Sequence, residues 1–281
     1  MTGTRIPIPA SQPRTPRHAG PPMPALYLQH ERTLLATISF IAFLVLWEVG
    51  SRTGFVDSFF FSSPTQVGAA AVAELRNPRF WDDFRVSGVE FVVGYGIAVA
   101  LAVPLGLAAG WYTKLHYLLD PWLNFMNALP RVALMPLIVL WVGIGIWSKV
   151  IVVFLGVFFA LLINTIRGAR SVDAQLVTVA SSFNASDRRM FTTLILPSSV
   201  PFIVAGLRLG IGRGLIGVVV GELYSSNAGL GHMITVAGNT LQTERLLFGV
   251  MLFTAFGICG AALLGRLERR LERWRPARRP H

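Results

Sequence analysis

Cysteine and charge are both scarce in this chain of 281 residues. The single cysteine, Cys259, excludes an internal disulfide. Charged residues make up 14% of the sequence, whereas a soluble domain carries about 25%. Hydrophobic residues reach 53%, which is more apolar surface than one soluble core of this size can bury. The composition therefore argues against an ordinary soluble protein and favours a chain that exposes much of its surface to lipid.

The patterns of nucleotide and metal chemistry are also missing. No G-x-x-x-x-G-K-[ST] occurs, so the chain has no phosphate-binding loop followed by lysine. The five histidines are scattered and have no metal-binding spacing. No paired His, Asp or Cys side chains fall within the apolar segments. We therefore expect no enzyme activity, no metal and no cofactor.

Six apolar segments are long enough to cross a bilayer, which takes about 20 residues. They lie at residues 33–50, 86–110, 122–145, 149–166, 199–224 and 246–265. The predicted fold class is an all-α polytopic membrane protein with six transmembrane helices, whose transmembrane domain covers residues 33–265. Residues 1–32, rich in Pro and Arg, are expected to form a disordered tail, and 266–281 a basic tail.

The distribution of Lys and Arg predicts the orientation. Sixteen of them fall on the side that holds both tails and six on the other side. The positive-inside rule therefore places both termini in the cytoplasm. The basic residues behind the net charge of +11 are then suited to anchor the chain against the anionic surface of the lipid bilayer. We expect no contact with nucleic acid, because no aromatic pattern accompanies the basic tail.

A short helix is predicted between the first two spans. Ser63 is a good N-cap, Pro64 suits the first helical position, and Gln66 completes a capping box. The helix should continue to Leu75 and end before Asn77-Pro78, and we expect it to lie at the outer membrane interface.

The cytoplasmic segment 167–196 carries two short apolar faces. The first is formed at i, i+3, i+4 and i+7 by Leu176, Val179, Ala180 and Phe183. The second is formed by Met190, Phe191, Leu194 and Ile195. Two short helices joined by a bend at Asn184 are therefore predicted, and Pro197 should mark the entry to the fifth span. Periodicity alone allows this segment either to lie on lipid or to dock on a partner.

This segment resembles the cytoplasmic loop of permeases of binding-protein-dependent ABC importers. The family pattern is Glu-Ala-Ala, three residues, Gly, and then nine or ten residues before apolar-x-Leu-Pro. Here Thr178-Val179-Ala180 and Asn184 take the first two places, and Leu194-Ile195-Leu196-Pro197 ends the pattern. Other segments are similar to the branch that imports nitrate, sulfonates and taurine: Phe61–Val67, Ala128-Leu129-Pro130, Trp141–Gly145, Gly206–Leu209 and Gly221-Glu222-Leu223.

The resemblance implies the permease subunit of a type I ABC importer in the bacterial inner membrane. It also implies two ATPase subunits, a second permease copy forming a homodimer, and an external solute-binding protein. The substrate it implies is a small anion such as a sulfonate, taurine or nitrate. The alternative is an ion-coupled secondary transporter, which should show an inverted repeat and a mid-membrane carboxylate.

The resemblance also assigns candidate residues to ATPase coupling: Thr178, Val179, Ala180, Phe183, Asn184, Arg188, Arg189, Leu196 and Pro197. Val179 and Phe183 are the expected apolar knobs, with Arg188 and Arg189 beside them. Asn184 tolerates the left-handed bend that Gly provides in the family, and it is expected to cap the second helix. Thr178 lacks the family's carboxylate, so docking either relies on apolar packing or is weakened.

Small and charged residues within the spans supply the remaining candidates. Five glycines of the fifth span favour close helix packing, and they are Gly206, Gly210, Gly214, Gly217 and Gly221. Arg208 and Arg213 lie on different helix faces, and Arg213 either attracts an anionic substrate or forms a structural contact. Glu222 is placed on the candidate translocation path as a hydrogen-bonding or gate residue. Glu48 and Glu90 are expected to be solvated near span ends.

Overall fold

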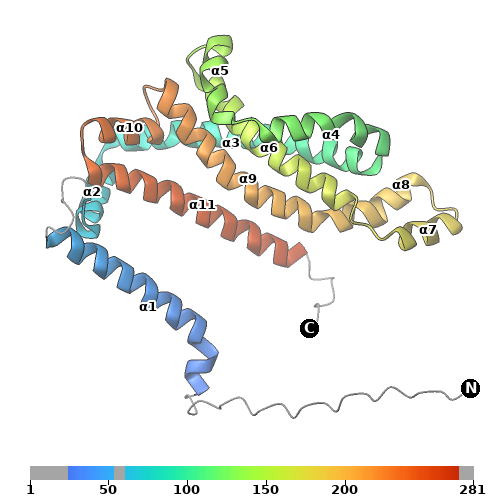
Figure 1. Cartoon of the computed structure of the whole chain (residues 1–281), viewed down its shortest axis with the longest axis horizontal. Helices are drawn as coiled ribbons and strands as arrows, with labels where there is room; N and C mark the ends of the chain where they lie inside the picture. Colours follow the sequence, from blue (N-terminus) through green and yellow to red (C-terminus); the bar gives the residue numbers. More distant parts are fainter. Residues whose placement is uncertain (1–24, 54–60, 272–281) are drawn as a thin grey trace, which may run out of the picture.

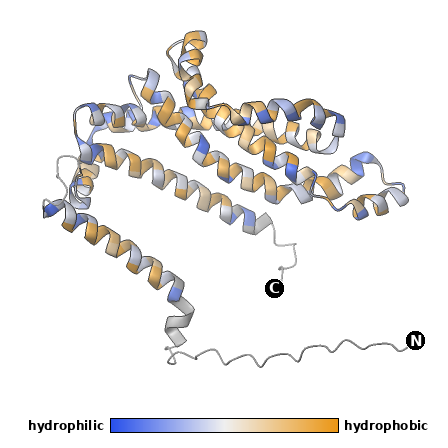
Figure 2. Cartoon of the chain, viewed as in Figure 1, coloured by the Kyte–Doolittle hydropathy of each residue, from blue (hydrophilic) through white to orange (hydrophobic). Residues whose placement is uncertain are grey.

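The computed structural model describes residues 25–53 and 61–271 of the chain. Within these ranges the structure is helical and contains no strand, which confirms the predicted all-α class. Long helices run between the two ends of the molecule, and their surfaces are mostly apolar (Figures 1 and 2). The elements are α1 (Ala25–Arg52), α2 (Pro64–Arg76), α3 (Pro78–Trp111), α4 (Thr113–Ala128), η1 (Arg131–Leu134), α5 (Met135–Val142), α6 (Ile146–Ala169), α7 (Ala174–Ser182), α8 (Asp187–Met190), η2 (Phe191–Ile195), α9 (Leu196–Ser225), α10 (Leu230–Asn239) and α11 (Thr243–Leu271).

Five helical stretches of the described residues are long and apolar enough to cross a membrane. They are Thr33–Arg52, Pro78–Trp111, Ile146–Ala169, Asp187–Ser225 and Thr243–Arg266. A sixth crossing results if α4 and the η1–α5 segment are counted as one broken span. The described residues therefore hold five or six candidate membrane spans, as expected of a multi-pass membrane protein.

The predicted third span, 122–145, is not one straight helix. Thr113–Ala128 and Val132–Val142 meet at an angle of 86°. Proline causes the break, because Pro130 disfavours helical geometry at the preceding residue, and Leu129 is indeed extended with ψ of 127°.

The predicted second short helix of the cytoplasmic segment does not stand apart from the fifth span. α8, η2 and α9 form one helical run from Asp187 to Ser225. Pro197 has no N–H to donate to the preceding turn. The ladder adjusts by a π-helical turn over Phe191–Ile195, in which the Leu196 N–H donates to the Phe191 carbonyl. The second half of the segment 167–196 is thus helically continuous with the fifth span.

Some predicted boundaries also shift. α3 begins at Pro78, well before residue 86, because Asn77 caps it by accepting from the Arg79 N–H at 3.1 Å. α1 begins at Ala25, so the predicted tail boundary at residue 32 lies inside this helix. The remaining parts of the two predicted tails, 1–24 and 272–281, lie outside the described residues.

The predicted capping box of α2 is confirmed. The Ser63 hydroxyl accepts from the Gln66 N–H at 3.3 Å, and the Gln66 side chain accepts from the Ser63 N–H at 2.8 Å. Glu48 of α1 reaches the same turn and accepts from the Thr65 N–H at 3.1 Å and its hydroxyl at 2.8 Å. Glu48 is therefore a partner of the α2 N-terminus rather than a merely solvated carboxylate. This contact joins one end of α1 to the bundle, from which the rest of α1 diverges (Figure 1).

The core of the bundle is α6 packed between α3 and α9. Val153, Val157 and Leu161 on α6 are fully buried. Together with Ala98 of α3 and Val218 of α9, the two valines form a continuous apolar cluster. α6 is therefore the rigid centre against which the candidate functional residues are positioned.

Candidate functional site

The α7–α8 elbow projects from the end of the bundle where α6 ends and α9 begins (Figure 1). Asp173 is the N-cap residue of α7, and its carboxylate accepts from the Gln175 N–H at 2.8 Å. After its C-cap residue Phe183, Asn184 adopts the left-handed conformation, φ 52°. The Asn184 N–H donates to the Ser181 carbonyl at 2.9 Å and the Ala185 N–H to the Ala180 carbonyl at 3.1 Å. This pair of bonds is a Schellman motif, which fixes the direction of the elbow.

Asn184 therefore closes the C-terminus of α7. The prediction that it caps the second helix is wrong, because Ser186 holds the N-cap position of α8. The left-handed conformation turns the chain at Asn184, and the next helix begins only after Ala185 and the N-cap residue Ser186. Asn is the non-Gly residue that suits such a position best.

The outer face of α7 is apolar and open. Val179 is 53% exposed and Phe183 is 82% exposed, and Leu176 lies on the same face. No residue of α7 is buried. Thr178 is exposed as well, and its hydroxyl donates to the Ala174 carbonyl of its own helix at 2.9 Å. The elbow thus presents an apolar ridge with no acidic group at the Thr178 position.

The other coupling candidates frame this ridge. Arg188 and Arg189 are exposed in the single turn of α8, while Ala180 is half-buried in the last turn of α7. Leu196 and Pro197 lie behind them, where the π turn joins α9. The structure brings these residues into one elbow at the end of the bundle.

The five glycines of α9 lie on the face that packs against α6. All five are buried: Gly206, Gly210, Gly214, Gly217 and Gly221. A Cβ added at Gly217 would lie 3.0 Å from the Val153 Cα, and one added at Gly221 would lie 3.0 Å from the Lys149 Cγ. Only a glycine lets the two helices approach this closely.

Arg213 lines a cavity of about 250 Å³ between α6, α9 and the break after α4. The other lining residues are Asn127, Leu129, Val132, Val152, Gly156, Ile216, Gly217 and Val220. Arg213 is the one charged side chain of this lining among those that the structure describes, and no described acidic side chain pairs with it. A guanidinium in such a place offers a fixed positive charge and several donors to an anion.

Arg208 has a different environment. Its guanidinium pairs with the Glu268 carboxylate of α11. Arg208 and Arg213 therefore do not meet, and Arg208 joins two helices whereas Arg213 faces a cavity.

Glu222 lies at the opposite end of the bundle from the elbow, beneath α10. It is 1% exposed. Its carboxylate accepts from the Ser87 hydroxyl at 2.5 Å and from the Gly231 N–H at 2.5 Å. The Ser87 oxygen accepts from the Leu230 N–H at 2.8 Å, and Asp83 accepts from the Gly229 N–H at 2.7 Å. Three side chains of α3 and α9 thus accept the free N–H groups at the N-terminus of α10. The N-cap residue of this helix makes no side-chain hydrogen bond to them.

A buried ion pair lies in the same half of the bundle. Lys149 of α6 is 3.6 Å from Glu90 of α3, and the residues are 5% and 1% exposed. The expectation that Glu90 is solvated is therefore wrong. Sequence reasoning missed Lys149, Ser87 and Asp83 as well, although a lysine beside a long apolar run was a usable signal.

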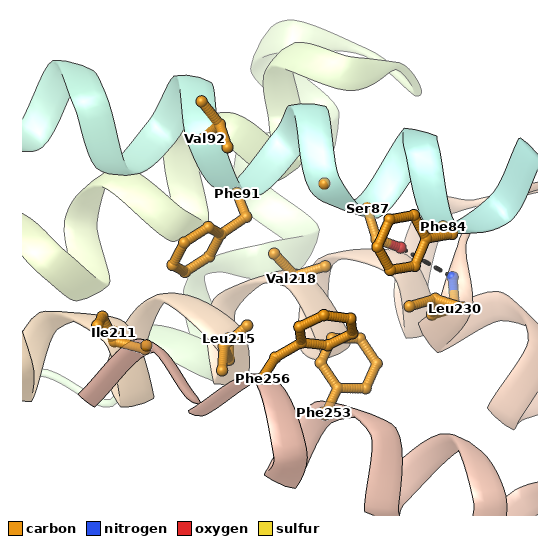
Figure 3. A pocket seen from close by; sticks show the side chains of 12 residues that line it. Phe84, Ser87, Phe91, Val92, Ile211, Leu215, Val218, Leu230, Phe253 and Phe256 are labelled. Atoms are coloured by element: carbon orange, nitrogen blue, oxygen red, sulfur yellow. Dashed lines mark hydrogen bonds between the residues drawn. The ribbon is translucent and has the colours of Figure 1, made fainter. Parts of the chain in front are cut away.

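An apolar cavity of about 190 Å³ separates α3, α9 and α11 near this cluster. Figure 3 shows phenylalanines from α3 and α11 pointing into it, with Ser87 at one end. The Ser87 oxygen already accepts from the Leu230 N–H, drawn as the dashed line. The cavity is therefore apolar, and its one hydroxyl is engaged in the α10 contact.

A multi-pass helical bundle with a projecting elbow places the chain among polytopic membrane proteins. The family model described as "Binding-protein-dependent transport system inner membrane component" matches residues 102–273. The chain belongs to this family. It is a multi-pass inner-membrane permease of an ABC importer and not an enzyme, and the ATPase is a separate subunit.

Two curated relatives cover most of the chain. A putative aliphatic sulfonates transport permease of Bacillus subtilis is 30% identical over 83% of this chain and 84% of its own length. A formylaminopyrimidine transport permease of Halalkalibacterium halodurans is 28% identical over 87% of this chain and 97% of its own length. These similarities remove the secondary transporter as an alternative.

The fold is also found in a solved structure. An inward-facing form of the MetNI methionine ABC transporter matches with a TM-score of 0.55 and 16% identity, over 67% of this chain and 94% of that chain. At this identity the match shows the fold alone, and it agrees with the predicted ABC importer permease architecture.

Proposed function

We propose that this permease carries a small anionic solute, of the sulfonate, taurine or nitrate kind, that an external binding protein delivers. The observation that supports an anion is the guanidinium of Arg213 at its cavity, which pairs with no acidic side chain of the described residues. Relatives of nearly equal similarity are named for different solutes, so similarity alone does not choose between them. Arg213 is the residue that favours an anion.

The physical argument rests on the cost of charge within a membrane. A cation inside a span faces water, protein or a functional partner, because lipid cannot solvate it. Arg213 lines a cavity where α6 and α9 meet the break between α4 and α5. An anion that passes this cavity gains charge-assisted hydrogen bonds that a neutral solute does not.

Uptake by the intact transporter in proteoliposomes tests this proposal. Ethanesulfonate, taurine and nitrate are the probes, with the binding protein added outside. Arg213→Gln should reduce uptake of the imported anion by about 10-fold or more, the loss of a hydrogen bond to a charged group, whereas Arg213→Lys should retain part of it. Lys114→Gln, an exposed charge outside the cavity, is the control. Uptake at the wild-type rate in Arg213→Gln, or no anion uptake by the wild type, contradicts the proposal.

Energy coupling is proposed to occur at the α7–α8 elbow. Val179 and Phe183 insert into a groove of the ATPase subunit, with Arg188 and Arg189 beside them. Burial of a phenylalanine from water is worth about 1.5–3 kcal/mol, so Phe183 is the strongest candidate for the contact. Because Thr178 supplies no carboxylate, apolar packing provides most of this docking energy.

The assembly and orientation complete the proposal. Two copies of this permease and two ATPase subunits form the transporter, with both termini in the cytoplasm as the positive-inside rule indicates. The elbow is then cytoplasmic, and α10 lies at the external end. Glu222 serves there as a gate residue that holds α10 over the translocation path.

A further inference from the structure

A groove of about 640 Å³ lies between the end of α3 and the start of the α8–α9 run. One wall is α3, with Val103, Leu107 and Ala108, and the opposite wall is Phe191 of the π turn. Leu107 and Phe191 belong to one apolar cluster, which closes the floor. From Val103 to Trp111 the α3 wall extends for about 12 Å at 1.5 Å per residue.

The two ends of this groove differ in chemistry. The end toward the middle of α3 is apolar, with Val103 and Pro104. The end at the elbow holds Trp111, Tyr112, Asp187 and Arg188. A tryptophan and a tyrosine at a helix end mark the depth of the membrane interface.

The charge at the mouth is positive. Arg188 lines it and makes no ion pair or side-chain hydrogen bond recorded among the described residues. Arg189 follows it in the same turn and Lys114 follows Tyr112 by two positions, against one acid, Asp187. An apolar channel with a basic mouth at interface depth is complementary to a phospholipid, whose acyl chain is apolar and whose phosphate is anionic.

We propose that this groove binds one anionic phospholipid of the cytoplasmic leaflet, with an acyl chain along α3 and the phosphate at Arg188. The proposal rests on the proposed orientation, which places the elbow on the cytoplasmic side. It does not depend on the identity of the imported solute. The lipid contacts α3 of the bundle and the first turn of the coupling run together, so its occupancy stabilises one position of the elbow relative to the bundle.

Native mass spectrometry of the intact transporter tests this site. The transporter is exchanged into nanodiscs of equal phosphatidylglycerol and phosphatidylcholine, and the lipids retained after release are identified. The wild type should retain phosphatidylglycerol in preference to phosphatidylcholine. Arg188→Gln should lower the retained phosphatidylglycerol by about fivefold. Ala108→Phe, which fills the groove and leaves Arg188 in place, should lower it as well.

Arg189→Gln is the matched control, because it removes the same charge from the neighbouring position outside the groove lining. It removes the more distant charge of the mouth, so its loss of phosphatidylglycerol should be smaller than that of Arg188→Gln. Equal retention in the wild type, Arg188→Gln and Ala108→Phe overturns the proposal. An equal loss of phosphatidylglycerol in Arg188→Gln and Arg189→Gln also overturns the proposal, because it indicates diffuse surface charge. The absence of any retained lipid overturns it too, because the ATPase then covers the groove. Lipid retention is measured without any transport reaction. A wrong assignment of the solute or of the coupling residues therefore leaves this result unchanged, so the two proposals fail separately.

Discussion

The Ser87 hydroxyl of α3 donates to the Glu222 carboxylate of α9 at 2.5 Å, across 135 positions of sequence. Both side chains are buried. The same two residues also accept the Leu230 and Gly231 N–H groups of α10. One pair of side chains therefore joins three helices at the end of the bundle farthest from the elbow (Figure 1).

Ser87→Ala should loosen α10. The change removes the donor to Glu222 and the acceptor of the Leu230 N–H, and each buried group left unsatisfied costs about 1–3 kcal/mol. We expect faster hydrogen exchange at Leu230 and a lower melting temperature in detergent. Ser182→Ala, an exposed hydroxyl on α7, should change neither. Unaltered exchange at Leu230 in Ser87→Ala would show that α10 is held by other contacts.

Lys149→Met should destabilise the protein strongly. It leaves the Glu90 carboxylate buried without its cation, and breaking a buried pair from one side costs about 3–5 kcal/mol. The double variant Lys149→Met with Glu90→Leu should be less destabilised than the sum of the two single variants. Lys114→Met is the control, because Lys114 is exposed. The measurement is thermal unfolding of the four variants, and additive losses would contradict the coupling of these two residues.

Gly217→Ala should separate α9 from α6. The added methyl group meets the Val153 backbone at 3.0 Å, where no side chain can turn away. Overpacking of this kind costs about 1–3 kcal/mol. Gly212 is the matched control on the same helix, because a Cβ there meets nothing within 4 Å. Gly212→Ala should be neutral or stabilising, since alanine favours the helix. Equal melting temperatures for the two variants would contradict close packing at Gly217.

Hydropathy and local chemistry predicted much of this fold. The apolar runs predicted the membrane helices, and Ser63, Pro64 and Gln66 predicted the start of α2, because these signals act within a few residues. The left-handed conformation at Asn184 is also local, since the residue type tolerates it.

Contacts between distant segments could not be predicted in the same way. The pairing of Lys149 with Glu90 depends on how far α6 is shifted along α3 where the two helices pack. The apolar periodicity of each helix does not predict that shift. The 86° break after α4 depends on how Pro130 is accommodated, because a proline within a membrane helix produces either a kink or a full break. The π turn before Pro197 is the milder outcome of the same chemistry.

We propose above that the ridge of Phe183 and Val179 transmits the state of the ATPase to the spans. The most direct measurement is ATP hydrolysis by the intact transporter, with and without the loaded binding protein, for Phe183→Asp. Ala174→Asp is the control, since Ala174 is exposed on the opposite face of α7, where a carboxylate suits the helix N-terminus. If the ridge transmits this state, Phe183→Asp inserts normally but loses the stimulation by the binding protein, while Ala174→Asp keeps it. Full stimulation in Phe183→Asp would contradict coupling through this ridge.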